Sequence, residues 1–171
     1  DFKTSINAYN DRRMIRILLL GIMSGFPWVL IGSSLTLWLK EDGLSRSAVG
    51  WAGLIFSIYA INFLWAPLID RIRIPVLARK IGQRKAWILC FQAVIFSALI
   101  SWSALSPAED IWFVMAVGLI IATASASQDI TIDALRIEQI KPSEKSAMAA
   151  AAAIHVTGWW SGYKIGGIIA L

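Results

Sequence analysis

The chain consists of long apolar stretches separated by short polar ones. Each apolar stretch holds about 20 residues with few charges, enough for a helix that rises about 1.5 Å per residue to cross a hydrocarbon core ~30 Å thick. None of them shows the strict alternation of apolar and polar residues expected of a membrane strand. We therefore predict an all-α, polytopic transmembrane bundle, with five helices over residues 17–39, 48–69, 86–105, 111–132 and 147–171.

The composition agrees with this pattern. Hydrophobic residues make up 57% of the 171-residue chain, more than the roughly 45–50% of ordinary soluble domains. Cys90 is the only cysteine, so a disulfide within the chain and a cysteine metal cluster are excluded. No ligand spacing and no pairing of a nucleophile with a base predicts a metal, a cofactor or an enzyme.

Basic residues fall almost entirely on one side of the predicted membrane. Thirteen of the sixteen Lys and Arg residues lie before the first helix, between the second and third, or between the fourth and fifth. Lys40 and Arg46 lie on the other side, and Lys164 lies inside the last helix. By the positive-inside rule, this asymmetry predicts a cytoplasmic N-terminus. No nucleic-acid-binding motif accompanies the net charge of +5.

Local residues mark several helix ends. Gly43 predicts the end of the first helix and Ser45 the start of the second. Segment 106–109, Ser-Pro-Ala-Glu, has capping-box spacing with proline at the first helical position. Pro75 argues against an uninterrupted helix through the basic connection that follows the second helix. In the last helix, glycines at spacing four from Gly158 predict close packing against a neighbour.

Two carboxylates, Asp129 and Asp133, stand at the inner end of the fourth apolar stretch. A charged carboxylate inside a bilayer costs roughly 2.5–3.5 kcal/mol, so such residues usually have a function. Their spacing of four places both on one helix face, and if that face lines a cavity one of them can carry a proton. The structural alternative is that Asp133 pairs with Arg136. We favour a functional role for Gln128 and Asp129 and leave that of Asp133 open.

Lys164 lies mid-span in the last stretch, where an unpaired ammonium is costly. A lysine there binds an anionic substrate or neutralises a carboxylate, and we favour a cavity-facing position because mid-span residues reach the interface poorly. His155, the only histidine, is better explained by packing. Serines such as Ser24 and Ser33 are better explained as hydrogen-bonding contacts between helices.

Several motifs together resemble a known family. They are segments 24–27 (Ser-Gly-Phe-Pro), 65–71 (Trp-Ala-Pro-Leu-Ile-Asp-Arg), 128–134 (Gln-Asp-Ile-Thr-Ile-Asp-Ala) and 162–166 (Gly-Tyr-Lys-Ile-Gly). In combination they resemble the AmpG-type muropeptide permeases of the major facilitator superfamily. Asp70-Arg71 together with segment 82–85 (Gly-Gln-Arg-Lys) resembles the superfamily signature between helices 2 and 3, although the insertion between these two halves is longer than usual.

The resemblance implies a twelve-helix secondary transporter of two six-helix halves in the bacterial inner membrane. Its activity would be proton-coupled uptake of anhydro-muropeptides, the products of peptidoglycan turnover. Residues 1–171 would form one incomplete N-terminal bundle without the sixth helix. Its partners would be a small-molecule substrate, protons, membrane lipid and the C-terminal half of the same transporter. Five helices cannot form a two-bundle rocking machine, so activity would belong to a longer parent or an assembly.

The resemblance also implies roles for individual residues. Substrate carboxylates would be attracted by a cation, and sugar faces would be covered by aromatic rings. The expected substrate-binding residues are Gln128, Trp159, Tyr163 and Lys164; the proton-coupling residues are Asp129 and Asp133; the gate or structural residues are Gly25, Asp70, Arg71, Arg84 and Arg136. Among the gate residues, Asp70 is expected to pair with Arg71.

Two alternatives remain open. A carrier of the same superfamily could move another anionic metabolite, and a non-transporting membrane scaffold could dock a partner through the glycine stripe. Neutralising Asp129 or Lys164 should abolish transport, whereas a scaffold should tolerate that change and fail when Gly162 becomes bulky. These opposite sensitivities separate the two classes of function.

Overall fold

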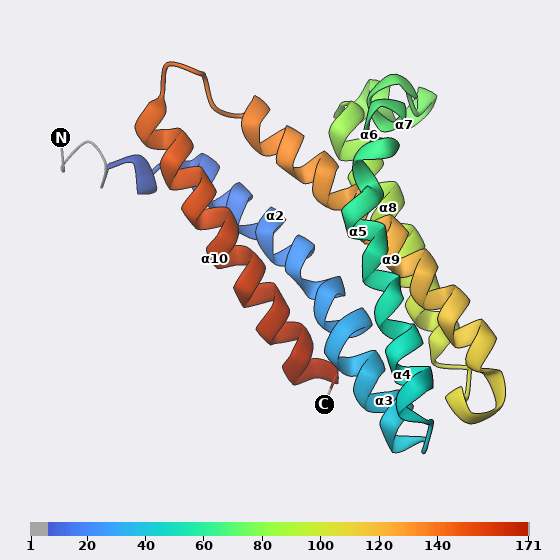
Figure 1. Cartoon of the computed structure of the whole chain (residues 1–171). Coiled ribbons are helices and arrows are strands. Elements are labelled where there is room, and N and C mark those ends of the chain that lie inside the picture. The colour runs from blue at the N-terminus through green and yellow to red at the C-terminus, as the bar shows by residue number, and fades with distance from the viewer. Residues whose placement is uncertain (1–6, 171) are drawn as a thin grey trace.

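The computed structural model describes residues 7–170, and every regular element in this range is helical (Figure 1). Lys3 and the last residue of the fifth predicted helix lie outside the described residues. The elements are α2 (Arg12–Val29), the π-helical η1 (Leu30–Ser34), α3 (Leu35–Glu41), α4 (Arg46–Gly53), η2 (Leu54–Phe56), α5 (Ser57–Ile61), η3 (Asn62–Leu64), α6 (Ala66–Arg71), α7 (Pro75–Ile81), α8 (Gln83–Trp102), α9 (Pro107–Glu138) and α10 (Lys145–Ala170).

Four helical runs are long and apolar enough to cross a membrane. They are Arg12–Glu41, Arg46–Leu64, Gln83–Trp102 and Pro107–Glu138. The predicted all-α transmembrane bundle is therefore confirmed. Helix α10 occupies the place predicted for a fifth span and has 26 residues, but it is not one of the four. Its membrane crossing stays a prediction.

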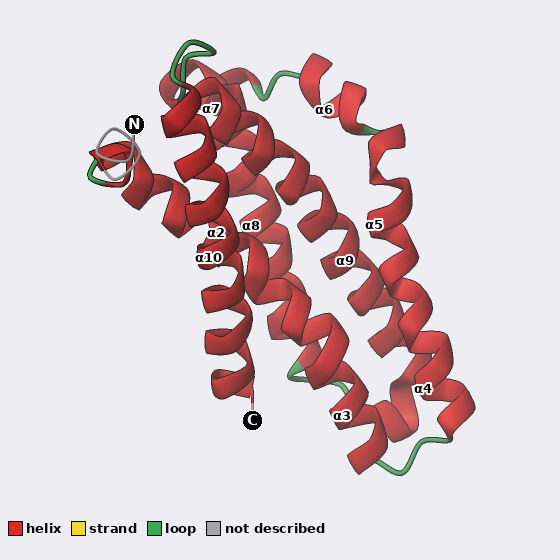
Figure 2. Ribbon diagram, turned by 60° about the vertical axis from the view of Figure 1, so that its left-hand side comes forward, coloured by secondary structure: helices red, strands yellow, loops and turns green. Residues whose placement is uncertain are grey.

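The bundle contains two tightly packed helix pairs, α2 with α10 and α8 with α9, and α2 also contacts α9 (Figures 1 and 2). Between α2 and α10 the backbones nearly touch, because glycines face each other there. A Cβ added to Gly21 or Gly25 of α2, or to Gly158 or Gly162 of α10, would overlap a backbone carbonyl of the other helix. The predicted packing role of the glycine stripe is thus explained by its contact with α2.

The main apolar core lies on the other side of α2, where α3, the α4–α5 run, α8 and α9 meet. Buried side chains from all of these elements form one cluster, which includes Leu35, Ile55, Ile95, Val114 and Ile121. Bulky branched residues fill this region, whereas small residues fill the α2–α10 contact. The helices therefore lie closer together at the α2–α10 contact than around this apolar core.

The second predicted helix, 48–69, is not continuous. Two 3₁₀ turns, η2 and η3, interrupt it, and the backbone leaves helical geometry at Trp65 (φ −107°, ψ 1°). Pro67 explains the last break, because proline lacks an N–H and its ring clashes with the carbonyl four residues earlier. Pro75 likewise starts a separate short helix, α7, instead of allowing one helix through the connection.

Helix ends follow the local residues closely, except at the two ends of α9. Gly43 has φ +76°, and Ser45 caps the next helix by accepting a hydrogen bond from the Ala48 N–H at 3.2 Å. Ser106 precedes α9 as predicted, but its hydroxyl forms no cap; its backbone N–H donates to the Asp110 carboxylate instead. Helix α9 extends to Glu138, six residues past the predicted end of the apolar stretch, because its charged C-terminal turns remain helical.

Candidate functional site

A carboxylate and a hydroxyl meet between α9 and α2. The Ser24 hydroxyl donates a hydrogen bond to the Asp129 carboxylate, and Ser24 is only 2% exposed. Within residues 7–170, Asp129 forms no ion pair with Lys, Arg or His. A membrane-length helix thus carries a carboxylate whose partner is a neutral hydroxyl. Such groups in membrane helices mark substrate or proton paths more often than structural contacts.

Gln128, the neighbour of Asp129, is fully buried and bonded through both ends of its amide. Its Nε2 donates to the Met23 carbonyl at 3.2 Å, and its Oε1 accepts from Gln92 Nε2 at 2.6 Å. The Met23 carbonyl is available because Pro27, four residues later, has no N–H to donate to it. The proline in α2 therefore creates the acceptor that Gln128 satisfies, and the bond fixes α9 against α2 at the level of Asp129.

An aromatic groove of about 620 Å³ lies beside this polar contact, between α2–α3, η2 and α10. Trp28, four residues after Ser24 and hence on the same face of α2, packs on Phe56 with ring centroids 4.9 Å apart. From α10, Trp159 stacks on Tyr163 with centroids 5.6 Å apart and planes at 17°. The groove is lined chiefly by Trp28, Ser33, Phe56, Trp159, Trp160 and Tyr163, with Lys40 at its end.

A hydroxyl pair lies across the groove. Ser33 Oγ and Tyr163 Oη are 2.9 Å apart, which joins the π-helical turn η1 to α10. Flat aromatic faces with a few hydroxyl groups suit a ligand that has both apolar ring faces and polar edges, as sugars do.

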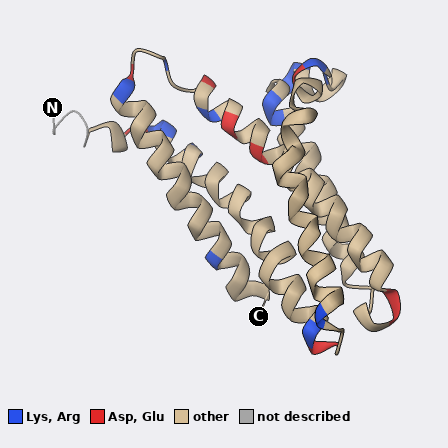
Figure 3. Cartoon of the chain, in the orientation of Figure 1, with Lys and Arg blue, Asp and Glu red and all other residues tan. Residues whose placement is uncertain are grey.

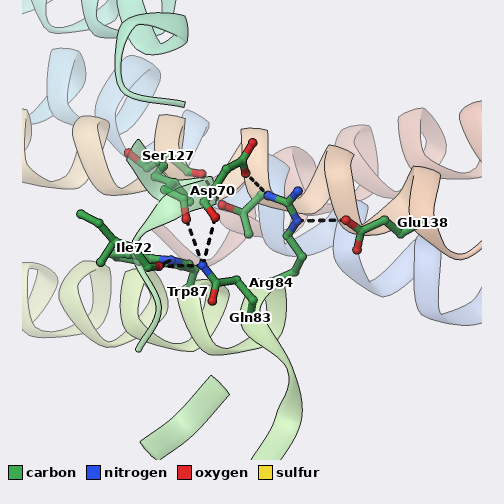
Figure 4. Close-up of polar contacts among 9 residues, drawn as sticks. Asp70, Ile72, Gln83, Arg84, Trp87, Ser127 and Glu138 are labelled. Carbon is green, nitrogen blue, oxygen red and sulfur yellow. Dashed lines mark hydrogen bonds and ion pairs between the residues drawn. The ribbon is translucent and has the colours of Figure 1, made fainter. Parts of the chain in front are cut away.

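Three residues form an ion network at the end of the bundle where α6, α8 and α9 meet, called here the basic end (Figure 4). Arg84 at the start of α8 pairs with Asp70 of α6 and, through Nε at 3.2 Å, with Glu138 at the end of α9. The expected pair of Asp70 with Arg71 is therefore wrong, because adjacent helical residues point about 100° apart and do not face each other. Arg71 is exposed and forms no ion pair among the described residues.

Side-chain amide and indole groups reinforce the same junction. Gln83 Nε2 donates to the Ile72 carbonyl at 2.6 Å, and Trp87 Nε1 donates to the same carbonyl at 3.0 Å (Figure 4). At the start of α6, Trp65 Nε1 donates to Ser127 Oγ of α9 at 2.9 Å. Helix α6 is thus tied to α9 at its start and to α8 at its end.

A separate ion cluster joins the start of α2 to the start of α10. Arg13 bonds to Asp11, to Glu144 at 2.8 Å and to the Gln139 carbonyl at 3.0 Å. The Arg13 guanidinium, with help from the Lys141 N–H, lowers the pKa of Glu144 from its ordinary 4.5 to about 2. The connection between α9 and α10 is therefore held to α2 by charge.

The structure brings together some of the sequence-predicted site residues and separates others. Gln128 and Asp129 lie at one level between α2 and α9, and Trp159 and Tyr163 line the adjacent groove. Lys164 is exposed on α10, one residue and about 100° round the helix from Tyr163, and does not line that groove.

The remaining predicted residues neither bond to Asp129 nor line the groove. Asp133 is exposed and pairs with Arg136 at 3.1 Å, as the structural alternative expected. Gly25 lies where α2 meets the backbone of Trp159 in α10. Asp70 and Arg84 belong to the ion network at the basic end.

Sequence reasoning missed three participants, Trp28, Gln92 and Glu138. Ser24 was expected to form a hydrogen bond between helices, as it does, but Asp129 was not named as its partner. Trp28 could have been identified as a neighbour of Ser24 from the sequence, since the two are four residues apart on one helix face. For Glu138 and Gln92 no local signal exists, because their partners are distant in sequence.

The chain is similar to several curated proteins, although no protein-family model matches it. It is 32% identical over 161 residues to a Rickettsia felis protein named AmpG 4, and 31% identical over 166 residues to the anhydromuropeptide permease of Escherichia coli K12. These alignments cover 94% and 97% of the chain but 37% and 32% of the relatives, so the chain spans about a third of their length. AmpG 3 of Rickettsia prowazekii is 33% identical over 80% of the chain and 32% of its own length. The resemblance seen in the motifs is thereby confirmed, and the chain is a multi-pass membrane protein of the AmpG type.

Proposed function

We propose that the chain is the N-terminal part of a proton-coupled secondary transporter that takes up anhydro-muropeptides. The observation that carries this proposal is the Asp129–Ser24 contact, a carboxylate without a cation partner among the described residues, held between two membrane-length helices beside an aromatic groove. The similarity to a permease of that name supplies the substrate class. The groove supports it, because stacked indole and phenol rings suit sugar faces.

In this mechanism Asp129 is the group that exchanges a proton. Protonation removes the negative charge that accepts the Ser24 hydrogen bond, so the contact between α9 and α2 weakens or reorients when the proton arrives. Gln128 keeps the two helices in register through the Met23 carbonyl, which localises the change to the carboxylate. Asp133, already paired with Arg136, contributes through the charge near this site.

Substrate contacts are assigned to the groove and the residues at its edge. Trp159 and Tyr163 cover the sugar faces, and Lys164 attracts peptide or muramyl carboxylates from a position that a second bundle would enclose. Gln128 is fully buried in this arrangement, so it meets a substrate only after the α2–α9 contact opens. The C-terminal half of the same transporter would supply the opposite wall of the cavity.

The proposed setting is the bacterial inner membrane with the N-terminus in the cytoplasm. The Lys and Arg residues at the start of α2, of the α6–α8 connection and of the α9–α10 connection gather at one end of the bundle (Figure 3). That end would face the cytoplasm by the positive-inside rule. The network of Asp70, Arg84 and Glu138 then acts as the inner-gate tie. Arg136, paired with Asp133, and Gly25, at the α2–α10 contact, have structural roles.

Uptake of labelled anhydro-muropeptide into membrane vesicles tests the proposal. We expect uptake by the complete protein that is driven by an inward proton gradient, and loss of this gradient dependence in Asp129→Asn at equal abundance. Glu109→Gln is the matched control, because Glu109 is an exposed carboxylate in the first turn of the same helix. Gradient-driven uptake that survives in Asp129→Asn would refute the coupling role. No uptake by the unmodified protein would refute the substrate, leaving another anionic metabolite or a scaffold.

A further inference from the structure

A second cavity, separate from the aromatic groove, lies at the basic end of the bundle. It measures about 790 Å³ and is formed by the α6–α8 connection together with the end of α9. Its lining includes four cationic residues, Arg73, Arg79, Arg84 and Lys85, and two acidic ones. The proposed transport mechanism uses the Asp70, Arg84 and Glu138 network in its wall as a gate tie, but assigns no ligand to the cavity.

The cations of this cavity are not balanced by its acids. Arg84 binds both carboxylates, those of Asp70 and Glu138. Arg73, Arg79 and Lys85 form no ion pair with any carboxylate in residues 7–170. The cavity therefore presents three free cations to whatever enters it.

Backbone donors add to this charge. The first hydrogen bond of α8 runs from the Ala86 N–H to the Gly82 carbonyl, so the N–H groups of residues 83–85 have no helical partner. Gly82 lines the cavity, has φ +90° and brings no side chain to cap the helix. The positive end of a 20-residue helix thus opens at the same place as the three free cations.

Exposed apolar side chains lie within two residues of the cavity's lining residues along the chain. Leu68 of α6 is 56% exposed, Ile72 of the connection 45% and Val76 of α7 71%. Cations interleaved with exposed apolar residues at the end of membrane helices are typical of a segment at the lipid headgroup level. This setting favours a lipid over a free phosphate compound, which would need no apolar border.

We propose that this cavity binds the phosphate of an anionic phospholipid headgroup from the adjacent leaflet. Arg73 and Arg79 form bidentate bonds to the phosphate oxygens, and Lys85 supplies a third charge. Leu68, Ile72 and Val76 contact the first acyl carbons. The site is independent of the transported substrate and stands whether or not the proposed function is right.

Native mass spectrometry of the expressed protein in neutral detergent tests the site with three probes: dioleoylphosphatidylglycerol, dioleoylphosphatidylcholine and inorganic phosphate. Each cation near an anionic surface is worth about five-fold in binding, so three are worth about 100-fold. We expect phosphatidylglycerol to bind at least ten-fold more tightly than phosphatidylcholine. We also expect the variant Arg73→Gln/Arg79→Gln/Lys85→Gln to lose most of this preference.

The matched control is Arg12→Gln/Arg16→Gln/Lys141→Gln. It removes the same charge from exposed positions at the same end of the bundle, outside the cavity. The control should keep the preference for phosphatidylglycerol. If both variants lost the preference for phosphatidylglycerol equally, the attraction would be due to diffuse charge and the proposed site would be overturned. Equal binding of the two lipids by the unmodified protein would also overturn it. Complete competition by inorganic phosphate at similar affinity would assign the cavity to a free phosphate compound. The lipid comparison on the unmodified protein decides the matter even if the triple variant does not fold.

Discussion

The glycine contact between α2 and α10 allows a sharp test by Gly162→Ala. A Cβ at this position would overlap the Ile22 carbonyl oxygen and lie 2.8 Å from its carbon and 2.9 Å from the Ile22 Cα. All three atoms belong to the backbone, so no side-chain rotation can relieve the overlap. The two helices must separate, or their backbones must distort.

The size of the effect follows from two opposing terms. Replacing glycine by alanine inside a helix gains up to about 1 kcal/mol of helix propensity. Inserting a methyl group into a closely packed contact costs about 1–3 kcal/mol. At Gly50 of α4 a Cβ would meet nothing within 4 Å, so Gly50→Ala gains helix propensity without the cost of overpacking. The propensity gain is common to both variants, so we expect Gly162→Ala to be about 1–3 kcal/mol less stable than Gly50→Ala.

The assay is equilibrium unfolding in mixed detergent micelles, followed by tryptophan fluorescence. A gap of about 1.4 kcal/mol between the two variants corresponds to a ten-fold difference in the ratio of folded to unfolded protein. If Gly162→Ala were as stable as Gly50→Ala, the close approach of α2 and α10 would be wrong. A third variant, Gly53→Ala, repeats the control at another open position.

Two further predictions concern polar contacts. Because the pKa of Glu144 is lowered to about 2, its contact with Arg13 stabilises the fold fully above pH ~4.5, and this stabilisation is lost as the pH falls towards 2. In Glu144→Gln, the unfolding midpoint should therefore change less with pH across that window than in the unmodified protein. An unchanged pH dependence would contradict the contact. Gln128→Leu leaves the Met23 carbonyl without a donor and should cost about 0.6–2 kcal/mol. Adding Pro27→Ala restores an N–H that can bond to the Met23 carbonyl, so the double variant should recover part of the lost stability in the same unfolding assay. If the stability changes of the two single variants simply add, the link between Gln128 and Pro27 is refuted.

Much of the architecture followed from local pattern. Apolar stretches of membrane length predicted the helices, and Gly43, Ser45 and Pro75 marked boundaries that the structure contains. Such signals act within a few residues and are therefore readable along the chain. The interruptions of the second span were missed, because a bundle can satisfy the groups that Pro67 frees, and hydropathy does not register this.

The candidate site was predicted less completely. Asp129 and Gln128 stood out because polar residues in an apolar stretch are conspicuous, and Trp159 and Tyr163 followed from the family resemblance. Their neighbours could not be named, since Ser24 lies 105 positions from Asp129. The expected Asp70–Arg71 pair failed because sequence adjacency is not spatial proximity on a helix; Arg84, fourteen positions away, fills that place.

The sequence by itself determined the helical class, most helix ends, the one-sided distribution of positive charge and the likeness to the AmpG type, because each depends on composition or on short motifs. Only the tertiary structure decided which polar groups meet: Ser24 with Asp129, Gln128 with the carbonyl freed by Pro27, and, around one cavity, three cations that form no ion pair within residues 7–170. The physical reason is that pairing between helices depends on which faces pack together. That choice depends on the fit of glycines and branched side chains across the whole bundle.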